Sequence, residues 1–410
     1  MEIGLSFLGT GNYKETDYRY GKLSFRTKLF PTALPTFCPE LAEVRIFVTD
    51  EAREKWLPEL QALWVEHRYS SKIVPVRIPP GADEEELWVI FEKIVESVPE
   101  DSSIVFDITH SFRSLPMISL LAVAYLKSAR RANLKHLLYG AFEARDDQCN
   151  STPVFDLTPM VSLLDWLSAY ERLFYSLDGS GLADLLNKIQ NNAYKGKRRN
   201  PPEQLKKLGQ ALTDFAGSLN LGRVQHTLDL VPRILQYSSN ESLLEETESW
   251  ARPLKQVLPL VSSVLHQIAE RGDDELDTHW RLAHLYYDKG FYLQSISLIR
   301  EWIVSRFCRE YDPHARIFDR DIRKNAEDGL NHIANQKAKR GNTGEEPPLP
   351  SIDRTTLDRY AAFWGKVRDT RNDALHLGFN KGANDTKTIE AKIKDYLQQK
   401  LEFDSTETGQ

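Results

Sequence analysis

The sequence predicts a doubly wound α/β domain followed by an all-α remainder. From residue 2 to about residue 160, short β-rich runs alternate with amphipathic stretches of helical length. After Pro159 the strand signal gives way to helices separated by polar loops. A length of 410 residues leaves room for two or three domains. We therefore expect a first domain at 1–160, a helical connector at 161–274 and a last helical domain at 275–410.

The expected first domain contains predicted strands, helices and an inserted hairpin. Strands are predicted at residues 3–8, 44–49, 73–78, 104–108 and 137–141, with helices at 50–67, 83–98 and 111–129. Between the first two strands, residues 18–30 alternate apolar and polar side chains, which predicts an inserted hairpin.

The last domain is predicted to contain a helical hairpin and a third long helix. The hairpin spans residues 282–307 and turns at 288–290, and the third helix begins near Asp353 and ends before Gly378. Arg300 and Glu301 in the hairpin are interpreted as a structural ion pair. Two polar breaks, at residues 195–202 and 337–350, predict exposed loops.

Composition excludes several classes of protein. With 53 Lys and Arg against 59 Asp and Glu, the net charge of −6 argues against coating of nucleic acid but leaves RNA or DNA open as a substrate. The longest apolar run, residues 118–126, is about half of the ~20 residues that a membrane span needs, and the first residues resemble a strand more than a signal peptide. We expect a cytoplasmic protein without a membrane segment. The wide spacing of Cys38, Cys149 and Cys308 predicts reduced, structural cysteines and no metal site.

A glycine-containing turn follows the first predicted strand. It reads Gly9-Thr10-Gly11-Asn12, and its two glycines allow a ligand to approach the backbone closely. The dinucleotide fingerprint would require glycine at position 14, where this chain has Lys14, so a nicotinamide cofactor is poorly supported. We expect no cofactor.

A second polar turn follows the fourth predicted strand and contains Asp107, Thr109, His110, Ser111 and Arg113. Ligands of open α/β sheets bind at the carboxyl ends of strands, where helix-start amides favour phosphate, and an arginine adds a charged fork. The turn therefore predicts a site for a nucleotide-like anion. Ordinary helix caps, a satisfied histidine and a surface arginine would explain the same residues equally well.

The end of the third long helix holds the candidate catalytic residues Arg371, Asn372 and His376. An arginine and a histidine four to six residues apart can divide RNA cleavage, because imidazole transfers protons while guanidinium stabilises charge on the phosphoryl oxygens. The same spacing occurs at Arg130 and Arg131 with His136 and at Arg309 with His314. Those sets lead into a strand or run through Pro313, so we favour the set beside the aromatic core face. A plain solvated helix end is the alternative.

Taken together, these motifs resemble the CRISPR-associated CARF–HEPN family, the ancillary ribonucleases of type III CRISPR systems, in the branch with an Asp-x-Thr-His-Gly motif. The resemblance rests on residues 5–13, 107–116, 139–144, 155–159, 300–302 and 371–376. Ser111 stands where the family motif usually has glycine.

The resemblance implies a Rossmann-like CARF domain that senses cyclic oligoadenylate, an all-α connector, and an all-α HEPN domain that cleaves single-stranded RNA without a metal. It also implies a homodimer, or a multiple of one, that shares one activator and pairs its HEPN domains. An even-numbered ring matches a two-fold interface, so cyclic tetra-adenylate is the expected activator. Arg371 and His376 would carry the cleavage through attack of the 2′-hydroxyl, with Asn372 orienting the RNA.

Two other functions remain open. In a CARF-controlled transcription regulator, the connector would bind DNA and the HEPN domain would only dimerise, but such a protein would not require the Arg371 and His376 pair. A metal-dependent nuclease would need clustered carboxylates, and the helical half of the sequence offers no such cluster.

Overall fold

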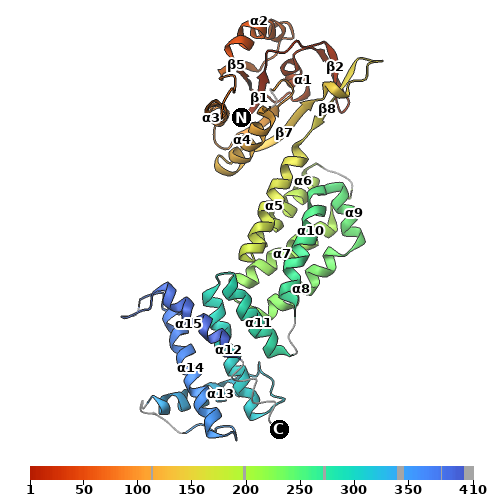
Figure 1. Ribbon diagram of the computed structural model, residues 1–410. Coiled ribbons are helices and arrows are strands. Elements are labelled where there is room, and N and C mark those ends of the chain that lie inside the picture. Colours follow the sequence, from red (N-terminus) through yellow and green to blue (C-terminus); the bar gives the residue numbers. More distant parts are fainter. Residues whose placement is uncertain (112–113, 197–199, 271–273, 339–345, 380, 401–410) are drawn as a thin grey trace. The chain divides into compact units, whose positions relative to one another are not determined.

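The computed structural model describes residues 1–111, 114–196, 200–270, 274–338, 346–379 and 381–400. The chain forms two compact units, Met1–Trp166 and Leu167–Gln410. Figure 1 shows a sheet with helices in the first unit and helices in the second. The predicted fold class, α/β followed by all-α, is confirmed. The boundary expected after residue 274 stays a prediction.

The first unit contains one eight-stranded sheet in the order β3-β2-β8-β7-β6-β1-β4-β5. The neighbours β5, β4, β1, β6 and β7 are parallel, whereas β8 is antiparallel to β7 and β3 to β2. The strands are β1 (Glu2–Leu8), β2 (Thr16–Tyr20), β3 (Leu23–Thr27), β4 (Glu43–Val48), β5 (Lys72–Arg77), β6 (Ser103–Asp107), β7 (Asn133–Gly140) and β8 (Ser151–Asp156).

Helices cover both faces of this sheet. Alternate side chains of β1 enter two separate cores: Leu5 and Phe7 pack with residues of α3 and α4, and Leu8 packs with residues of α1 and α2. Burial on both faces explains why the central strands are apolar throughout. The helices are η1 (Phe30–Ala33), α1 (Leu34–Phe37), α2 (Asp50–Glu66), α3 (Glu84–Glu96), α4 (Leu115–Ala129), η2 (Phe142–Ala144) and α5 (Thr158–Ser176).

The predicted hairpin is confirmed as β2 and β3, but β8 was not expected from the sequence. Proline cannot donate to a strand ladder, so Pro153 weakens the strand signal of residues 151–156. The carbonyl of Pro153 nevertheless accepts a hydrogen bond from Ala141 N at 2.9 Å. Because β8 pairs with both β7 and β2, it joins the hairpin to the parallel sheet.

The second unit is helical in its described ranges. Its helices are α6 (Ser180–Lys195), α7 (Glu203–Asn220), α8 (Val224–Ser238), α9 (Glu241–Trp250), α10 (Arg252–Ala269), α11 (Glu275–Asp288), α12 (Tyr292–Tyr311), α13 (Arg320–Lys337), α14 (Arg354–Leu375) and α15 (Thr386–Gln398). The turn expected at 288–290 is confirmed between α11 and α12, where Gly290 has a φ of 77°. The third long helix is α14, and its N-cap is Asp353.

The interpretation of Arg300 and Glu301 as a structural ion pair is confirmed. Their side chains are 2.6 Å apart, and Arg300 also binds Glu327 of α13 at 2.7 Å. The guanidinium carbon of Arg300 lies 5.2 Å from the ring centre of Trp364, so one arginine links α12, α13 and α14. Across the described ranges, no helix is long and apolar enough to cross a membrane.

Candidate functional site

The two polar turns predicted from the sequence leave neighbouring strand ends. After β1 the chain builds β4 and β5 on one side of β1 and then returns to place β6 on the other. Ser6 of β1 pairs in register with Asp107 of β6, so the turns at residues 9–12 and 109–111 follow adjacent positions. This is the topological switch point of the sheet, where α/β proteins bind ligands.

Asp107 holds the second turn through hydrogen bonds of its buried carboxylate. The side chain is fully buried, and its carboxylate accepts hydrogen bonds from Ser6 Oγ at 2.5 Å and from Thr109 N at 2.8 Å. Burial raises the pKa of Asp107 to about 6, although these hydrogen bonds oppose the rise. Thr109 Oγ1 in turn accepts a hydrogen bond from Gly140 N at 2.8 Å, which ties the turn to the end of β7.

His110 is a satisfied, buried histidine. Phe30 N donates a hydrogen bond to its Nε2 at 3.0 Å, and the imidazole centre lies 3.9 Å from the ring centre of Tyr13. Burial lowers the pKa of His110 to about 3, so the ring is neutral at ordinary pH. The ring therefore joins the second turn to the β3–η1 segment and to the first turn.

The first turn is held by two side chains of α2 that the sequence analysis did not select. Lys55 Nζ donates hydrogen bonds to Thr10 O at 2.8 Å and to Asn12 Oδ1 at 2.9 Å. Trp56 Nε1 donates to Gly11 O at 3.1 Å. One sequence signal could have identified these two residues: they lie in the second turn of α2, which directly follows β4, the strand parallel and adjacent to β1.

Exposure separates the predicted ligand residues into two groups. Gly9, Asp107 and His110 are buried and support the turns. Gly11 and Asn12 are exposed, and Thr10, Thr109 and Ser111 are partly exposed. Arg113, the predicted charged fork, lies outside the described residues. The geometry thus brings together every described member of the predicted set.

The candidate catalytic residues lie where α14 ends. The helix stops because Leu377 and Gly378 adopt positive φ values of 53° and 79°, which ends a helix in a left-handed turn. Asn372 and His376 are exposed and Arg371 is partly buried.

Arg371 differs from Arg300 of the same unit in having no carboxylate partner among the described residues. Within the described ranges it forms no ion pair with a carboxylate, its Nε is buried without a hydrogen-bond partner, and its Nη1 lies 3.3 Å from Asn372 Oδ1. Arg300, in contrast, binds Glu301 and Glu327. A buried polar group without a partner is costly, so the guanidinium of Arg371 suits an incoming anion.

The alternative Arg and His pairs have other roles. Arg131 is paired with Asp101 at 2.9 Å, and His136 Nδ1 lies 2.7 Å from Asp156 Oδ2. Arg309 forms an ion pair with Asp274 at the start of α11. Carboxylates therefore neutralise Arg131 and Arg309, whereas Arg130 donates to the carbonyl of Val98 at 3.2 Å. The choice of the α14 set stays a prediction.

Packing fixes the last turns of α14. Asn331 Oδ1 of α13 accepts hydrogen bonds from Trp364 Nε1 at 2.9 Å and from Arg368 Nη1 at 3.3 Å. One residue before Arg371, Thr370 Oγ1 lies 2.8 Å from the hydroxyl of Tyr396 in α15. These contacts hold the backbone that presents the candidate catalytic side chains.

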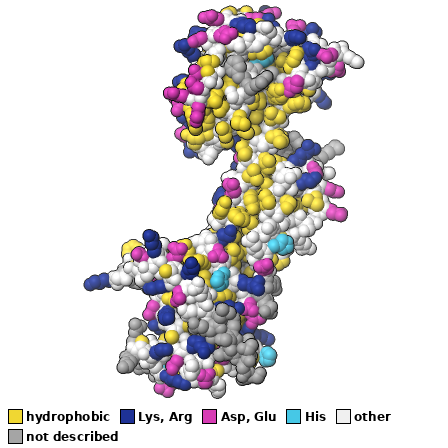
Figure 2. Space-filling view, viewed as in Figure 1, with side chains coloured by type: hydrophobic (Ala, Val, Ile, Leu, Met, Phe, Trp, Pro, Cys, Tyr) yellow, Lys and Arg dark blue, Asp and Glu magenta, His cyan; other side chains and the backbone are white. Residues whose placement is uncertain are grey.

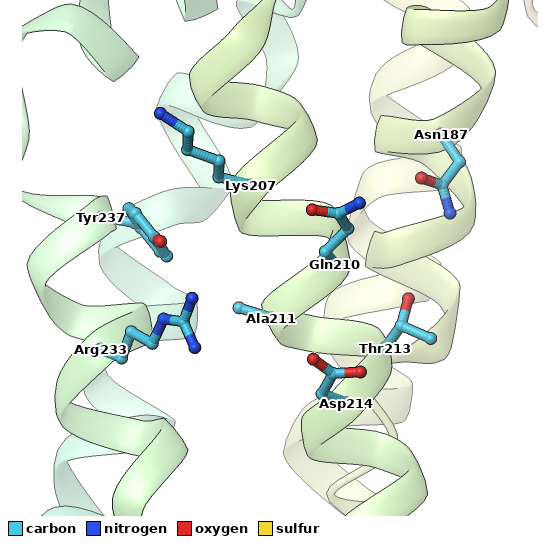
Figure 3. A pocket seen from close by; sticks show the side chains of 8 residues that line it. All are labelled: Asn187, Lys207, Gln210, Ala211, Thr213, Asp214, Arg233 and Tyr237. Carbon is cyan, nitrogen blue, oxygen red and sulfur yellow. The ribbon is translucent and has the colours of Figure 1, made fainter.

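A further polar cavity of about 430 Å³ lies among the connector helices. Figure 3 shows the guanidinium of Arg233 on α8 and the carboxylate of Asp214 on α7 pointing toward the same space. Lys207 and Tyr237 lie at the other end of this cavity. For the part of the chain that the structure describes, no group of three or more His, Cys, Asp or Glu side chains is arranged to hold a metal ion.

The fold and the two candidate sites define a protein with an α/β unit, whose two polar turns follow adjacent strand ends, and a helical unit with a partly buried arginine and an exposed histidine at one helix end. The sequence is 21% identical, over 315 residues, to "CRISPR-associated protein MJ1674" of Methanocaldococcus jannaschii. That match covers 74% of this chain and 42% of the relative, so the chain spans less than half of the relative's length. This similarity confirms the CRISPR-associated part of the predicted resemblance.

Structural comparison gives a weaker similarity. A solved structure titled Enterococcus italicus Csm6 bound to cyclic hexa-2′-fluoro-hexa-dAMP matches 97% of this chain and 92% of that chain, with 11% identity and a TM-score of 0.38. This score is too low to establish a common fold. No protein-family model matches the sequence.

Proposed function

We propose that this chain is an ancillary endoribonuclease of CRISPR defence that cleaves single-stranded RNA when cyclic oligoadenylate binds its first unit. The observation that carries the proposal is the end of α14, where Arg371, partly buried and without a carboxylate partner among the described residues, lies in the last two turns before the exposed C-cap His376. The similarity to a CRISPR-associated relative supports the cellular context.

The chemistry assigned to this helix end needs no metal. Arg371 binds non-bridging oxygens of the scissile phosphate and stabilises the charge that grows there. His376 transfers protons, removing one from the attacking 2′-hydroxyl or giving one to the departing 5′-oxygen. The new P–O bond forms as the P–O5′ bond breaks, which yields a 2′,3′-cyclic phosphate and a 5′-hydroxyl. Asn372 orients the RNA.

The activator is assigned to the two polar turns of the first unit. Its phosphates bind the exposed backbone of residues 10–12 and the turn at 109–111, with Arg113 adding charge. Gly9, Asp107 and His110 act from beneath by holding these turns. Cyclic tetra-adenylate is our preferred activator because a ring with two matching halves suits a two-fold dimer.

An exposed apolar surface of the first unit supports the proposed homodimer. On α4, Met117 and Leu121 are 70% and 55% exposed, and Trp88 of α3 and Met160 of α5 are 59% and 69% exposed. Figure 2 shows hydrophobic side chains gathered on this unit. A second copy of the chain would cover this surface, because large exposed apolar patches commonly mark interfaces.

A cleavage assay tests the proposal. The full chain is incubated with labelled single-stranded RNA, with each of the cyclic tri-, tetra-, penta- and hexa-adenylates in turn, and with EDTA present. We expect cleavage only with an activator, products ending in 2′,3′-cyclic phosphate, and no loss of activity in EDTA. Equal cleavage of DNA, or cleavage abolished by EDTA, would contradict the mechanism. Binding of duplex DNA without RNA cleavage would support the transcription regulator instead.

A further inference from the structure

A cavity of about 680 Å³ lies in the second unit between the start of α8 and helices α11 to α13. Its volume is within the ~300–1,000 Å³ range of small-molecule sites. Among its lining residues are Arg223, His279 and Phe318, and none of the lining residues belongs to the candidate cleavage site.

The N-terminus of α8 forms one end of the cavity. Residues 222–226 line it, and no side chain caps the first turn of this 15-residue helix. The first-turn amides of a helix lack intrahelical acceptors and carry the positive end of the helix dipole. Arg223, the N-cap residue, is exposed and adds a full positive charge. This end of the cavity is therefore suited to an anion.

A buried histidine independently indicates a ligand. His279 borders the cavity with only 6% of its surface exposed, and no described residue forms a hydrogen bond with its ring nitrogens. Burial lowers the pKa of His279, so the neutral ring offers one donor and one acceptor. Because this ring lines the cavity, its nitrogens are available to a ligand with polar edges.

An aromatic ring lies beside this histidine. The ring centre of Phe318 is 6.3 Å from that of His279, with the rings nearly perpendicular, and Phe318 is 60% exposed. An exposed aromatic ring at the edge of a cavity offers a stacking surface for a base.

The carboxylate in the cavity does not repel an anion, because it is already balanced. Glu301 forms ion pairs with both Arg300 and Arg323. Arg323 also donates hydrogen bonds to Ser305 Oγ at 2.8 Å and to Ile317 O at 2.7 Å, so this wall is fixed. With Arg223 added, the positive charges on the cavity wall outnumber the negative ones.

We propose that this cavity binds a nucleotide, with its phosphate on the first turn of α8 and Arg223, its base stacked on the exposed ring of Phe318 and the polar edge of that base toward His279. A free mononucleotide and one residue of an RNA strand share this chemistry. The site is separate from the activator crevice and from Arg371 and His376, so it does not depend on the proposed ribonuclease activity.

Calorimetric titration of the full chain distinguishes the two sources. The probes are AMP, inorganic phosphate and a short 2′-O-methylated single-stranded RNA, which lacks the attacking hydroxyl. We expect AMP or the RNA to bind more tightly than phosphate. Arg223→Glu should weaken that binding by about tenfold, since a charge-assisted hydrogen bond contributes about 1.5–3 kcal/mol, and Phe318→Ala should also weaken it. Arg233→Glu, an exposed arginine of the same helix that lines the other cavity, should leave it unchanged.

A second readout reports on the buried histidine directly. The NMR signals of the His279 ring, assigned by comparison with His279→Gln, should shift when the ligand binds. If AMP binds, shifts the His279 signals and binds less tightly to the Arg223 and Phe318 variants, the natural ligand is a free nucleotide. If only the RNA does so, the natural ligand is a residue of an RNA strand. Equal binding of phosphate and AMP that Phe318→Ala leaves unaffected would overturn the proposal. It would equally be overturned if no probe moved the His279 signals.

Discussion

Ser6 Oγ donates a hydrogen bond of 2.5 Å to Asp107 Oδ2 between the two adjacent parallel strands β1 and β6. The pair lies directly beneath the two turns of the candidate crevice. The Asp107 carboxylate holds the second turn through its hydrogen bonds. Because this carboxylate is fully buried, it also makes the stability of the first unit depend on pH.

Asp107→Asn should remove part of that dependence. Burial raises the pKa of Asp107 from 3.8 to about 6, so the folded state holds a proton that the unfolded state releases between these values. The contribution of Asp107 to the free energy of unfolding should therefore fall as pH rises through this window, by about 3 kcal/mol at most, and stay level above it, whereas the contribution of His110 rises over the same range. The asparagine variant keeps the hydrogen-bonding shape and should lack this fall. Denaturant unfolding followed at β1 and β6 by pulsed hydrogen exchange measures it.

Asp101→Asn is the matched control for this experiment. Asp101 is exposed, and its hydrogen bond with Arg131 lowers its pKa, so its contribution has the opposite sign. The stability of this variant should keep the contribution of Asp107 that falls between pH 4 and 6, so its difference from Asp107→Asn should change with pH as the wild type's does. A free energy of unfolding that depends on pH identically in the wild type and in Asp107→Asn would assign the pH dependence to another group.

His110→Phe should act in the opposite direction with pH. Burial lowers the pKa of His110 from 6.5 to about 3, so the unfolded chain takes up a proton in this range and the folded chain does not. The contribution of His110 to wild-type stability should therefore be lost as pH falls through the range, and the variant should not lose this part. At pH 7 the variant should be less stable by about 1–3 kcal/mol, because Phe30 N loses its acceptor. Unfolding curves at pH 4, 5.5 and 7, with His314→Gln as an exposed control, test both effects.

The sequence predicted the two polar turns after β1 and β6 but not what holds them. Alternating runs and polar turns are local patterns, which a sequence reports well. The roles of Lys55 and Trp56 depend on α2 packing beside the end of β1, a long-range contact without a local signal. Strand β8 was missed for a related reason, since its pairing with β7 and β2 outweighs the effect of Pro153.

The candidate catalytic helix end could be chosen from the sequence only by elimination. The spacing of arginine and histidine occurs three times, and the decisive property is whether the arginine already has a carboxylate partner. Those partners come from distant segments, as Asp274 does for Arg309 and Asp101 does for Arg131. For this reason spacing alone could not separate the sets, and the choice of the α14 set stays a prediction.

Arg371→Ala and His376→Ala should each abolish most RNA cleavage while leaving the fold intact, because both side chains lie at a helix end outside the core. Loss of general acid–base catalysis by His376→Ala should reduce the rate by about 10²–10⁴-fold. Activator binding should be unchanged in both variants. Initial rates at saturating activator, together with far-ultraviolet circular dichroism, provide the measurement.

His314→Ala is the control for the catalytic pair, since it has the same spacing from Arg309 and is exposed. Its cleavage rate should match that of the wild type. A His314 variant as inactive as His376→Ala, or full activity in both α14 variants, would move the active site away from α14.

Lys55→Ala should weaken activation without lowering the maximal rate. Removing the ammonium group frees Thr10 O and Asn12 Oδ1, so the turn at residues 9–12 loses its attachment to α2 and must be ordered by the activator. The activator concentration for half-maximal cleavage should rise by about tenfold, as expected for one charge-assisted hydrogen-bond group. Arg53→Ala, an exposed residue on the same helix, should have no effect. A lower maximal rate with unchanged half-maximal concentration would place Lys55 outside the sensor.

The exposed apolar surface of α4 should hold the proposed dimer together. Leu121 is 55% exposed on α4, and Lys127 Nζ of the same helix lies 2.6 Å from Asp165 Oδ2 of α5, so the apolar surfaces of these helices are neighbours. Leu121→Lys should convert a dimer into monomers and abolish activation, whereas Val65→Lys, at an apolar residue of α2 that is 78% exposed, should do neither.

The wild type should be a dimer, or a multiple of one, with and without activator. To raise the active fraction from about 1% to about 99%, the activator must then favour the active arrangement by ~5.5 kcal/mol. Light scattering coupled to size exclusion checks the assembly, and a wild type that is monomeric until activator is added would mean that mass action controls cleavage.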